Sequence, residues 1–214
     1  MSISGTSPPT VGRRFVENSH RARRAGLVCL AGASLQVLYG LLAVLFPYPA
    51  IAESGFEVLW ALANVGMIAG VVGWLSLDVA RPRRVAVIGG GLAILGYLLR
   101  IGVSVVRLLN PDAAVDAVIV GTILLMFAGM GVVAVGTLLG RQLSGWQAWV
   151  PLLTVAAGLM TATFYSIDKV IHFILLGLFW GLAWMLLGYL VWNRAAESAK
   201  IGHDVQAAPQ PSSP

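Results

Sequence analysis

Arg100 is the side chain with the strongest chemical consequence, because it is an arginine set inside a long apolar run. It lies about six residues from the end of that run, which is about 9 Å at the rise of an α-helix. A guanidinium at such depth in a bilayer is costly unless it reaches the interface or meets a partner. The positions around it alternate in steps of three and four, so one helical stripe holds Gly90, Ala93, Tyr97, Arg100, Ser104 and Arg107. The bulky apolar residues lie on the other face, which predicts that Arg100 points into a helix bundle.

Five further polar side chains occur at similar depth, or at the ends of other apolar runs. Together with Arg100 they form the candidate ligand-binding set: Asn64, Tyr97, Asp116, Asp168 and His172. A buried arginine requires a counter-charge, and we expect Asp116 to supply it, with Asp168 as the second choice. Structural interpretations compete, because Asp168 suits a helix start and an isolated histidine is usually a satisfied polar residue. Three roles remain open for Arg100 itself: an internal ion pair, extension to the lipid headgroups, or contact with a ligand.

The sequence contains none of the motifs that would indicate an enzyme or a bound cofactor. HExxH, GxSxG and P-loop patterns are absent, and no pair of histidines within the apolar runs could hold a haem. The single cysteine, Cys29, has no second thiol to pair with. We therefore predict no catalytic residues, no metal ligands and no cofactor. An intramembrane enzyme that uses His172 with Asp116 or Asp168 as acid and base is the least favoured function.

The composition identifies the surroundings in which these residues must work. Of the 214 residues, 58% are hydrophobic and 11% are charged, with a mean hydropathy of +0.84. A soluble domain carries about 25% charged residues, and this chain could not hide so much apolar surface from water. Six apolar runs are long enough to cross a bilayer: 25–46, 55–77, 85–106, 111–139, 146–163 and 167–192. We predict an all-α bundle of six transmembrane helices over residues 25–193, with disordered polar tails at 1–24 and 194–214.

Local signals mark the starts of three of these helices. Ser54 and Glu57 predict a capping box at the second helix. The Asn-Pro-Asp segment 110–112 predicts a cap and a first turn for the fourth, and its aspartate is expected to pair with Arg107. Asp168 predicts the start of the sixth helix.

The basic residues predict the orientation. Of the 14 lysines and arginines, all but Arg100, Arg107 and Lys169 fall in the tails or in the loops near residues 81 and 141. Because positively charged loops stay in the cytoplasm, both termini are predicted to be cytoplasmic. The tryptophans at 74, 146, 149 and 192 would form the inner aromatic belt, and Tyr48, Phe56 and Tyr165 the outer one.

Two patterns concern how the helices assemble. Arg-rich segments precede the first, third and fifth helices at a spacing of 60 residues (81 − 21 and 141 − 81), which leaves open a repeat of three hairpins. Three small-xxx-small pairs, at 66 and 70, 136 and 140, and 177 and 181, let helix backbones approach closely. These pairs indicate internal packing first, and they leave open a homo-oligomer or a membrane partner.

The remaining signals concern surroundings and partners. The net charge of +5 does not indicate nucleic-acid binding, because the basic residues flank apolar runs and form no separate basic surface. The partner they suit is the lipid bilayer. Arginine exceeds lysine, which is typical of GC-rich bacterial genomes, so we expect a bacterial cytoplasmic membrane. Residues 136–141, followed by 149–153 and Gly158, resemble the cytoplasmic elbow of a broad set of uncharacterised six-span bacterial membrane proteins, a resemblance that implies the fold and no activity.

Two functions remain in competition. One is a small binding or transport protein whose outward-facing polar pocket around Arg100 takes a polar or anionic solute. The other is an accessory or scaffolding membrane subunit whose polar cluster only fixes helix packing.

The predicted orientation can be tested by cysteine labelling in intact cells. A membrane-impermeant thiol reagent should label Ser54→Cys, in an outward loop, and should leave Ser213→Cys protected because the C-terminal tail is cytoplasmic. Labelling of Ser213→Cys with protection of Ser54→Cys would overturn the orientation.

Overall fold

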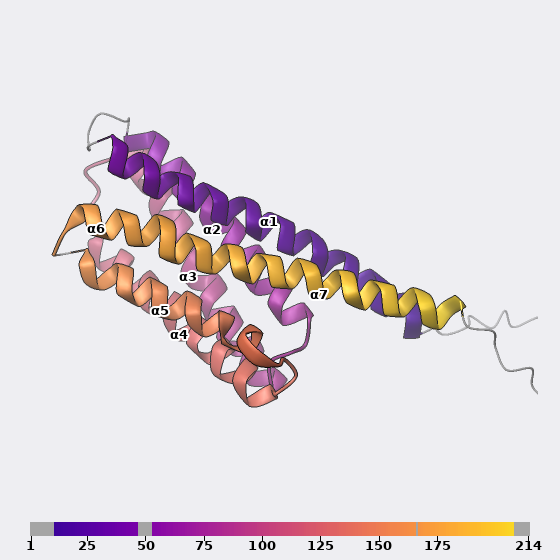
Figure 1. Cartoon of the computed structure of the whole chain (residues 1–214). Coiled ribbons are helices and arrows are strands. Elements are labelled where there is room, and N and C mark those ends of the chain that lie inside the picture. The colour runs from indigo at the N-terminus through magenta and orange to yellow at the C-terminus, as the bar shows by residue number, and fades with distance from the viewer. Residues whose placement is uncertain (1–10, 47–52, 166, 208–214) are drawn as a thin grey trace, which may run out of the picture.

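The protein is a bundle of long helices. The computed structural model describes residues 11–46, 53–165 and 167–207, and this part contains helices and no strands (Figure 1). The first five spans are α1 (Val11–Leu45), α2 (Glu53–Ser76), α3 (Arg83–Leu109), α4 (Asp116–Gly140) and α5 (Val150–Phe164). The last span joins α6 (Lys169–Ile174), the π-helix η2 (Leu175–Trp180) and α7 (Gly181–Ala207). A short 3₁₀-helix, η1 (Gly145–Trp149), precedes α5. Six helices of the described chain are long and apolar enough to cross a membrane, which confirms the predicted all-α bundle.

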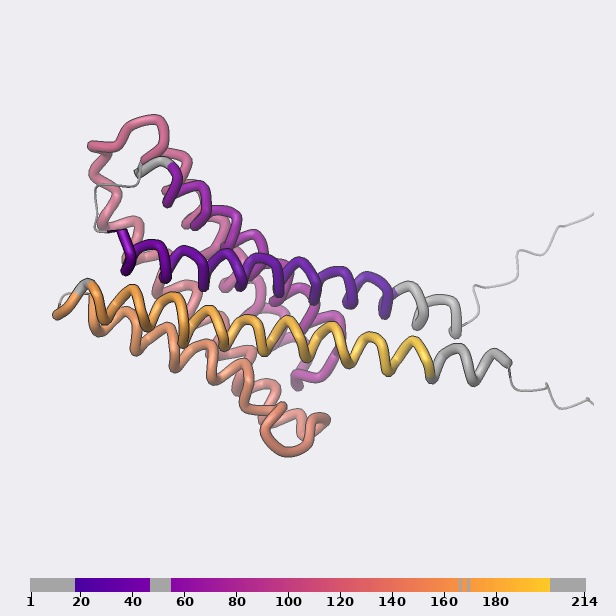
Figure 2. The backbone as a smooth tube through the Cα atoms, turned by 45° about the horizontal axis from the view of Figure 1, so that its top comes forward, coloured from indigo at the N-terminus to yellow at the C-terminus, as the bar shows by residue number. Residues whose placement is uncertain are grey.

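Each span contacts the next one along the chain, and the last span closes the bundle against the first. The most extensive contacts join α1 to α7, α3 to α4, and α1 to α2. Figures 1 and 2 show α1 and α7 side by side, projecting together beyond the other helices at one end. We call this end, which carries Arg23, Arg81, Arg141 and Arg194, the basic end. The opposite end carries Phe46, the loop at 110–115 and Tyr165. α1 begins and α7 ends at the basic end (Figure 1), so the described parts of the two terminal segments share a side.

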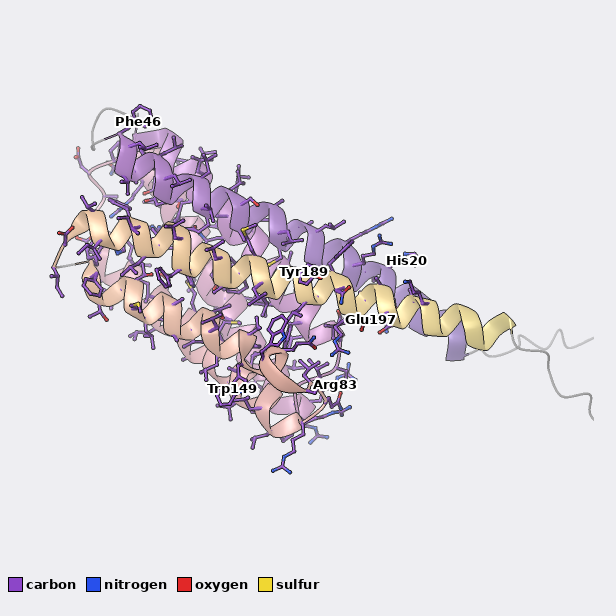
Figure 3. The ribbon with its side chains drawn as sticks, viewed as in Figure 1. His20, Phe46, Arg83, Trp149, Tyr189 and Glu197 are labelled. Carbon is purple, nitrogen blue, oxygen red and sulfur yellow. The ribbon has the colours of Figure 1, made fainter. Side chains whose placement is uncertain are left out.

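The two terminal helices are longer than we expected. Residues 11–24 and 194–207 belong to α1 and α7, although we had expected them to be disordered. Contacts between the helices explain the difference: Ala22 and Ala195 are buried, and the Arg23 guanidinium lies 5.7 Å from the centre of the Trp192 ring. Figure 3 shows this extended pair near the labelled His20 and Glu197.

The predicted start of the fourth helix is wrong. The fourth span begins at Asp116, and Asn110 is the C-cap of α3, so residues 110–115 form a loop. α2 begins at Glu53, close to the predicted start at residue 55, and the Ser54 side chain, on which the capping box depends, lies outside the described residues. The start at Asp168 is confirmed, because its Oδ1 accepts hydrogen bonds from the backbone N–H groups of Val170 at 2.8 Å and Ile171 at 3.0 Å.

Glycine allows the backbones of three helices to touch. A Cβ placed on Gly32 of α1 would lie 2.5 Å from the Cα of Gly66 in α2. A Cβ placed on Gly177 of η2 would lie 2.8 Å from the Cα of Gly40 in α1. All three predicted small-xxx-small pairs meet other parts of the same chain, so internal packing explains them. The hairpin repeat and a partner bound through these faces stay predictions.

Large aromatic side chains fill the centre of the bundle. Trp184 is fully buried, and its ring meets that of Tyr97 edge to face. Trp74 was predicted to lie in an interfacial belt, but it is buried and donates from Nε1 to Thr137 Oγ1 at 3.1 Å. Phe56 is also buried, whereas Tyr165 is exposed and Tyr48 lies outside the described residues. Hydropathy along a helix indicates the depth of an aromatic residue but not the direction in which it points.

The glycine contact between α1 and α2 predicts a strong position dependence of stability. Gly66→Ala should lower the midpoint of thermal unfolding in detergent, because the added methyl group meets backbone and overpacking costs about 1–3 kcal/mol. The matched control is Gly91→Ala on α3, where a Cβ would meet nothing within 4 Å. That change should be neutral or stabilising, because alanine favours helix over glycine. Equal midpoints for the two variants would contradict the contact.

Candidate functional site

Two polar stripes, one on α2 and one on α3, face each other at the end of the bundle that lies opposite the basic end. On α2, Glu57, Trp60 and Asn64 follow steps of three and four, so they share one face. On α3, Arg100, Ser104 and Arg107 do the same. The helices pack side by side and run in opposite directions, so the start of α2 meets the end of α3. The two stripes therefore form one cluster, with Glu57 level with Arg107 and the Arg100 guanidinium beside Trp60.

Arg107 binds two acids from two different helices. Its Nη1 lies 3.4 Å from Glu57 Oε1, and its Nη2 lies 3.4 Å from Asp116 Oδ1. The Glu57 side chain is 16% exposed and that of Asp116 is 95% exposed, so the bridge runs from the interior to the surface. It ties α2, α3 and α4 together.

This bridge overturns both ion pairs that we expected from the sequence. Asp116 was assigned to Arg100, and Arg107 was assigned to Asp112. Because α4 begins at Asp116, this residue lies at the rim of the bundle and not one turn inside it. It is therefore level with Arg107, the more exposed arginine, and not with Arg100.

Arg100 lies inside the bundle with an aromatic ring as its neighbour. Its Cζ is 5.2 Å from the centre of the Trp60 ring, in the geometry of a cation–π contact. Within the described residues it forms no ion pair, and its Nη1 is buried without a hydrogen-bond partner. The α3 stripe predicted the inward direction, but the π face of Trp60 takes the place of the expected carboxylate.

Trp60 belongs to a chain of aromatic rings contributed by four segments. Its ring centre lies 5.2 Å from that of Tyr39 in α1 and 5.9 Å from that of Trp180 in η2. Tyr39 also meets Phe56 at 5.2 Å and Phe173 of α6 at 6.1 Å. These rings form a wall beside the Arg100 guanidinium. Trp180 reaches this wall from a π-helix, a rare conformation that is common at functional sites.

Several buried polar atoms of α1, α2 and α3 lack hydrogen-bond partners. Asn64 is fully buried, and its Nδ2 donates to the Trp60 carbonyl at 2.6 Å while its Oδ1 is unpaired. Glu57 Oε2, Trp60 Nε1, Ser104 Oγ and both amide atoms of Gln36 are also unpaired. A polar group buried in this way is costly, and more so where a bilayer excludes water. Atoms of this kind are the groups that a bound water or a polar solute would satisfy.

The other residues of the candidate set have local roles. Asp168 caps α6. His172 Nδ1 lies 2.9 Å from the Thr161 carbonyl, and its ring packs between Tyr165 and Phe173. Tyr97 is buried against Trp184. No group of three or more potential metal ligands occurs in the part of the chain that the structure describes.

Sequence reasoning missed three residues that carry buried, unpaired polar atoms. Glu57 was assigned to a capping box, whereas its Oε1 lies 3.4 Å from Nη1 of Arg107. Gln36 is an amide in the middle of an apolar run, and this signal could have identified it. Trp60 offered no signal, because a tryptophan in a membrane helix is ordinarily packing. Of the six residues that we expected, the structure brings Arg100 to the Trp60 ring, bonds Asn64 to the backbone of its own helix, and leaves Asp116 and Asp168 at helix starts.

The assignment of the acids predicts which pairs are coupled. In a double-mutant cycle, Glu57→Gln and Arg107→Gln should be coupled by about 0.5–3 kcal/mol, as expected for groups in contact. Arg100→Leu and Asp116→Leu should be additive, because Asp116 belongs to Arg107. Unfolding in detergent measures both cycles. A clear recovery of stability in the Arg100–Asp116 double variant would show that these two residues are paired after all.

Comparison of the chain with protein-family models, with curated proteins and with solved structures finds no match.

Proposed function

We propose that this chain is a multi-pass protein of the bacterial cytoplasmic membrane that binds or transports a small polar or anionic solute at Arg100. The site would be reached from the opposite end of the bundle, which faces outward when the arginines of the basic end lie in the cytoplasm. The observation that carries the proposal is the Arg100 guanidinium, buried at Nη1 and without a carboxylate partner in the described residues.

The acids of the cluster pair with Arg107 and not with Arg100. Charged groups inside a membrane protein pair with one another or mark a path for a substrate. The two acids of this cluster, Glu57 and Asp116, both bind Arg107. A structural arginine at position 100 would be expected to hold one of them. A solute that brings hydrogen-bond acceptors would satisfy both the charge and the free N–H group.

The second candidate, an accessory or scaffolding subunit, is favoured by a different observation. Helix backbones touch at Gly32 and Gly66 and at Gly40 and Gly177, which suits a rigid protein whose interior serves packing. In that case Trp60 alone would stabilise the arginine, and no solute would act through it.

A thermal-shift experiment in detergent or nanodiscs separates the two functions. Acetate, lactate, phosphate, sulfate and alanine should be tested separately against the parent chain and Arg100→Gln. A solute at 100 times its Kd stabilises the folded state by about 2.7 kcal/mol, so at least one should raise the unfolding midpoint of the parent and leave that of Arg100→Gln unchanged.

The matched control is Arg83→Gln at the basic end, where the arginine side chain is 69% exposed. It should respond to the solute as the parent does. If Arg100→Gln fails to fold, Arg100→Lys keeps the charge but loses the planar pair of donors, and it should weaken the response. Equal responses from the parent and a folded Arg100 variant, or no response to any solute, would favour the accessory subunit.

A further inference from the structure

The charges of the cluster balance within the protein. Arg100 and Arg107 contribute two positive charges, and Glu57 and Asp116 contribute two negative charges. Asp116 is at the rim, and Arg107 lies between it and Glu57. The Asp116 side chain is 95% exposed, so solvent screens its charge. The charged groups that a solute can still satisfy inside the bundle are the unpaired atoms of Arg100 and Glu57.

The unpaired atoms of the cluster include one from a positively charged side chain and one from a negatively charged side chain. Arg100 Nη1 is a buried cationic donor, and Glu57 Oε2 is a buried anionic acceptor, each without a hydrogen-bond partner among the described residues. Both lie next to the same ring system, because Arg100 covers Trp60 and Glu57 is one helical turn before Trp60 on α2. The unpaired Asn64 Oδ1 adds an uncharged acceptor one turn beyond Trp60.

We propose that the solute is a small zwitterion with a carboxylate and a protonated amine, as in a free amino acid. This inference rests on the proposed function and names its substrate class. The carboxylate accepts a hydrogen bond from Arg100 Nη1, and the ammonium donates to Glu57 Oε2. One solute then satisfies both buried charges and leaves the net charge of the cluster unchanged.

Two further features support an ammonium group beside Glu57. Phe56, which precedes Glu57 in the chain, and Trp60, one turn after it, both contact the ring of Tyr39, and aromatic faces attract cations. Arg107 holds Glu57 through Oε1 alone, which keeps the carboxylate in place and leaves Oε2 free. Arg107 is therefore a positioning residue. A quaternary ammonium lacks N–H donors and would leave Oε2 unpaired, so a betaine should bind less well than an amine.

Ligands with matched skeletons test the charge requirement directly. Alanine, propionate and ethylamine differ in which charged groups they carry, and phenylalanine, 3-phenylpropionate and 2-phenylethylamine form the same series with a larger body. Binding to the parent chain in nanodiscs can be measured by calorimetry at neutral pH. In at least one series the zwitterion should bind at least about tenfold more tightly than either singly charged analogue, or about 1.4 kcal/mol. The N-trimethyl derivative of that zwitterion should lose a similar factor.

Variants assign the two charges to their residues. Arg100→Gln should abolish the advantage of ligands with a carboxylate, and Glu57→Gln should abolish the advantage of the zwitterion over the carboxylate analogue. The control is Asp78→Asn at the basic end, whose carboxylate pairs with Arg81 at 2.8 Å; it should leave all affinities unchanged. If Glu57→Gln does not fold, the ligand series on the parent chain decides the question without it.

The outcomes separate this inference from the proposed function. If propionate or 3-phenylpropionate binds as tightly as its amino acid, and binding depends on Arg100, the solute is a simple anion; the zwitterion inference is then wrong while the proposed function stands. If Arg100→Gln folds and no ligand loses affinity, both are wrong.

Discussion

Close approach of helix backbones at glycine is the constraint on which the other contacts of this bundle depend. Apolar side chains gain little by leaving lipid for protein, so helices in a bilayer associate through tight packing and polar contacts. Here α1 touches α2 at Gly32 and Gly66, and it touches the last span at Gly40 and Gly177. These contacts set the relative heights of three helices. The ring contacts of Tyr39, Trp60 and Trp180 follow from this register.

The polar cluster shows the consequence of that register for charge. Arg107, at the end of α3, is level with the starts of α2 and α4, and so it meets both Glu57 and Asp116. Arg100 lies two turns further inside, below the reach of the exposed Asp116. Its neighbour is the face of Trp60. An arginine stabilised by a π face keeps its charge available, whereas one neutralised by a carboxylate does not. This difference gives the site its chemical interest.

The last span has a special part in holding the aromatic wall. Its π-helix, η2, contains both Gly177, where the chain touches α1, and Trp180, whose ring contacts those of Trp60 and of Phe127 in α4. The π-helical turn therefore combines a tight backbone contact with a large inward side chain. A change in this segment would act on Trp60 and, through it, on the surroundings of Arg100.

Hydropathy, charge and helical period determined much of this protein from the sequence alone: six apolar helices, one side for both terminal segments, and the inward direction of Arg100. These are properties of single segments, so they can be recognised without knowing the neighbours of a segment. Tertiary structure decided the partners. Contacts such as that of Arg23 with Trp192 extend α1 and α7, and packing buries Trp74. Asp116 pairs with Arg107, and Glu57 and Gln36 carry buried atoms without hydrogen-bond partners. The physical reason is that a partner depends on the height and rotation of a neighbouring helix, and backbone contacts between residues far apart in the chain set both.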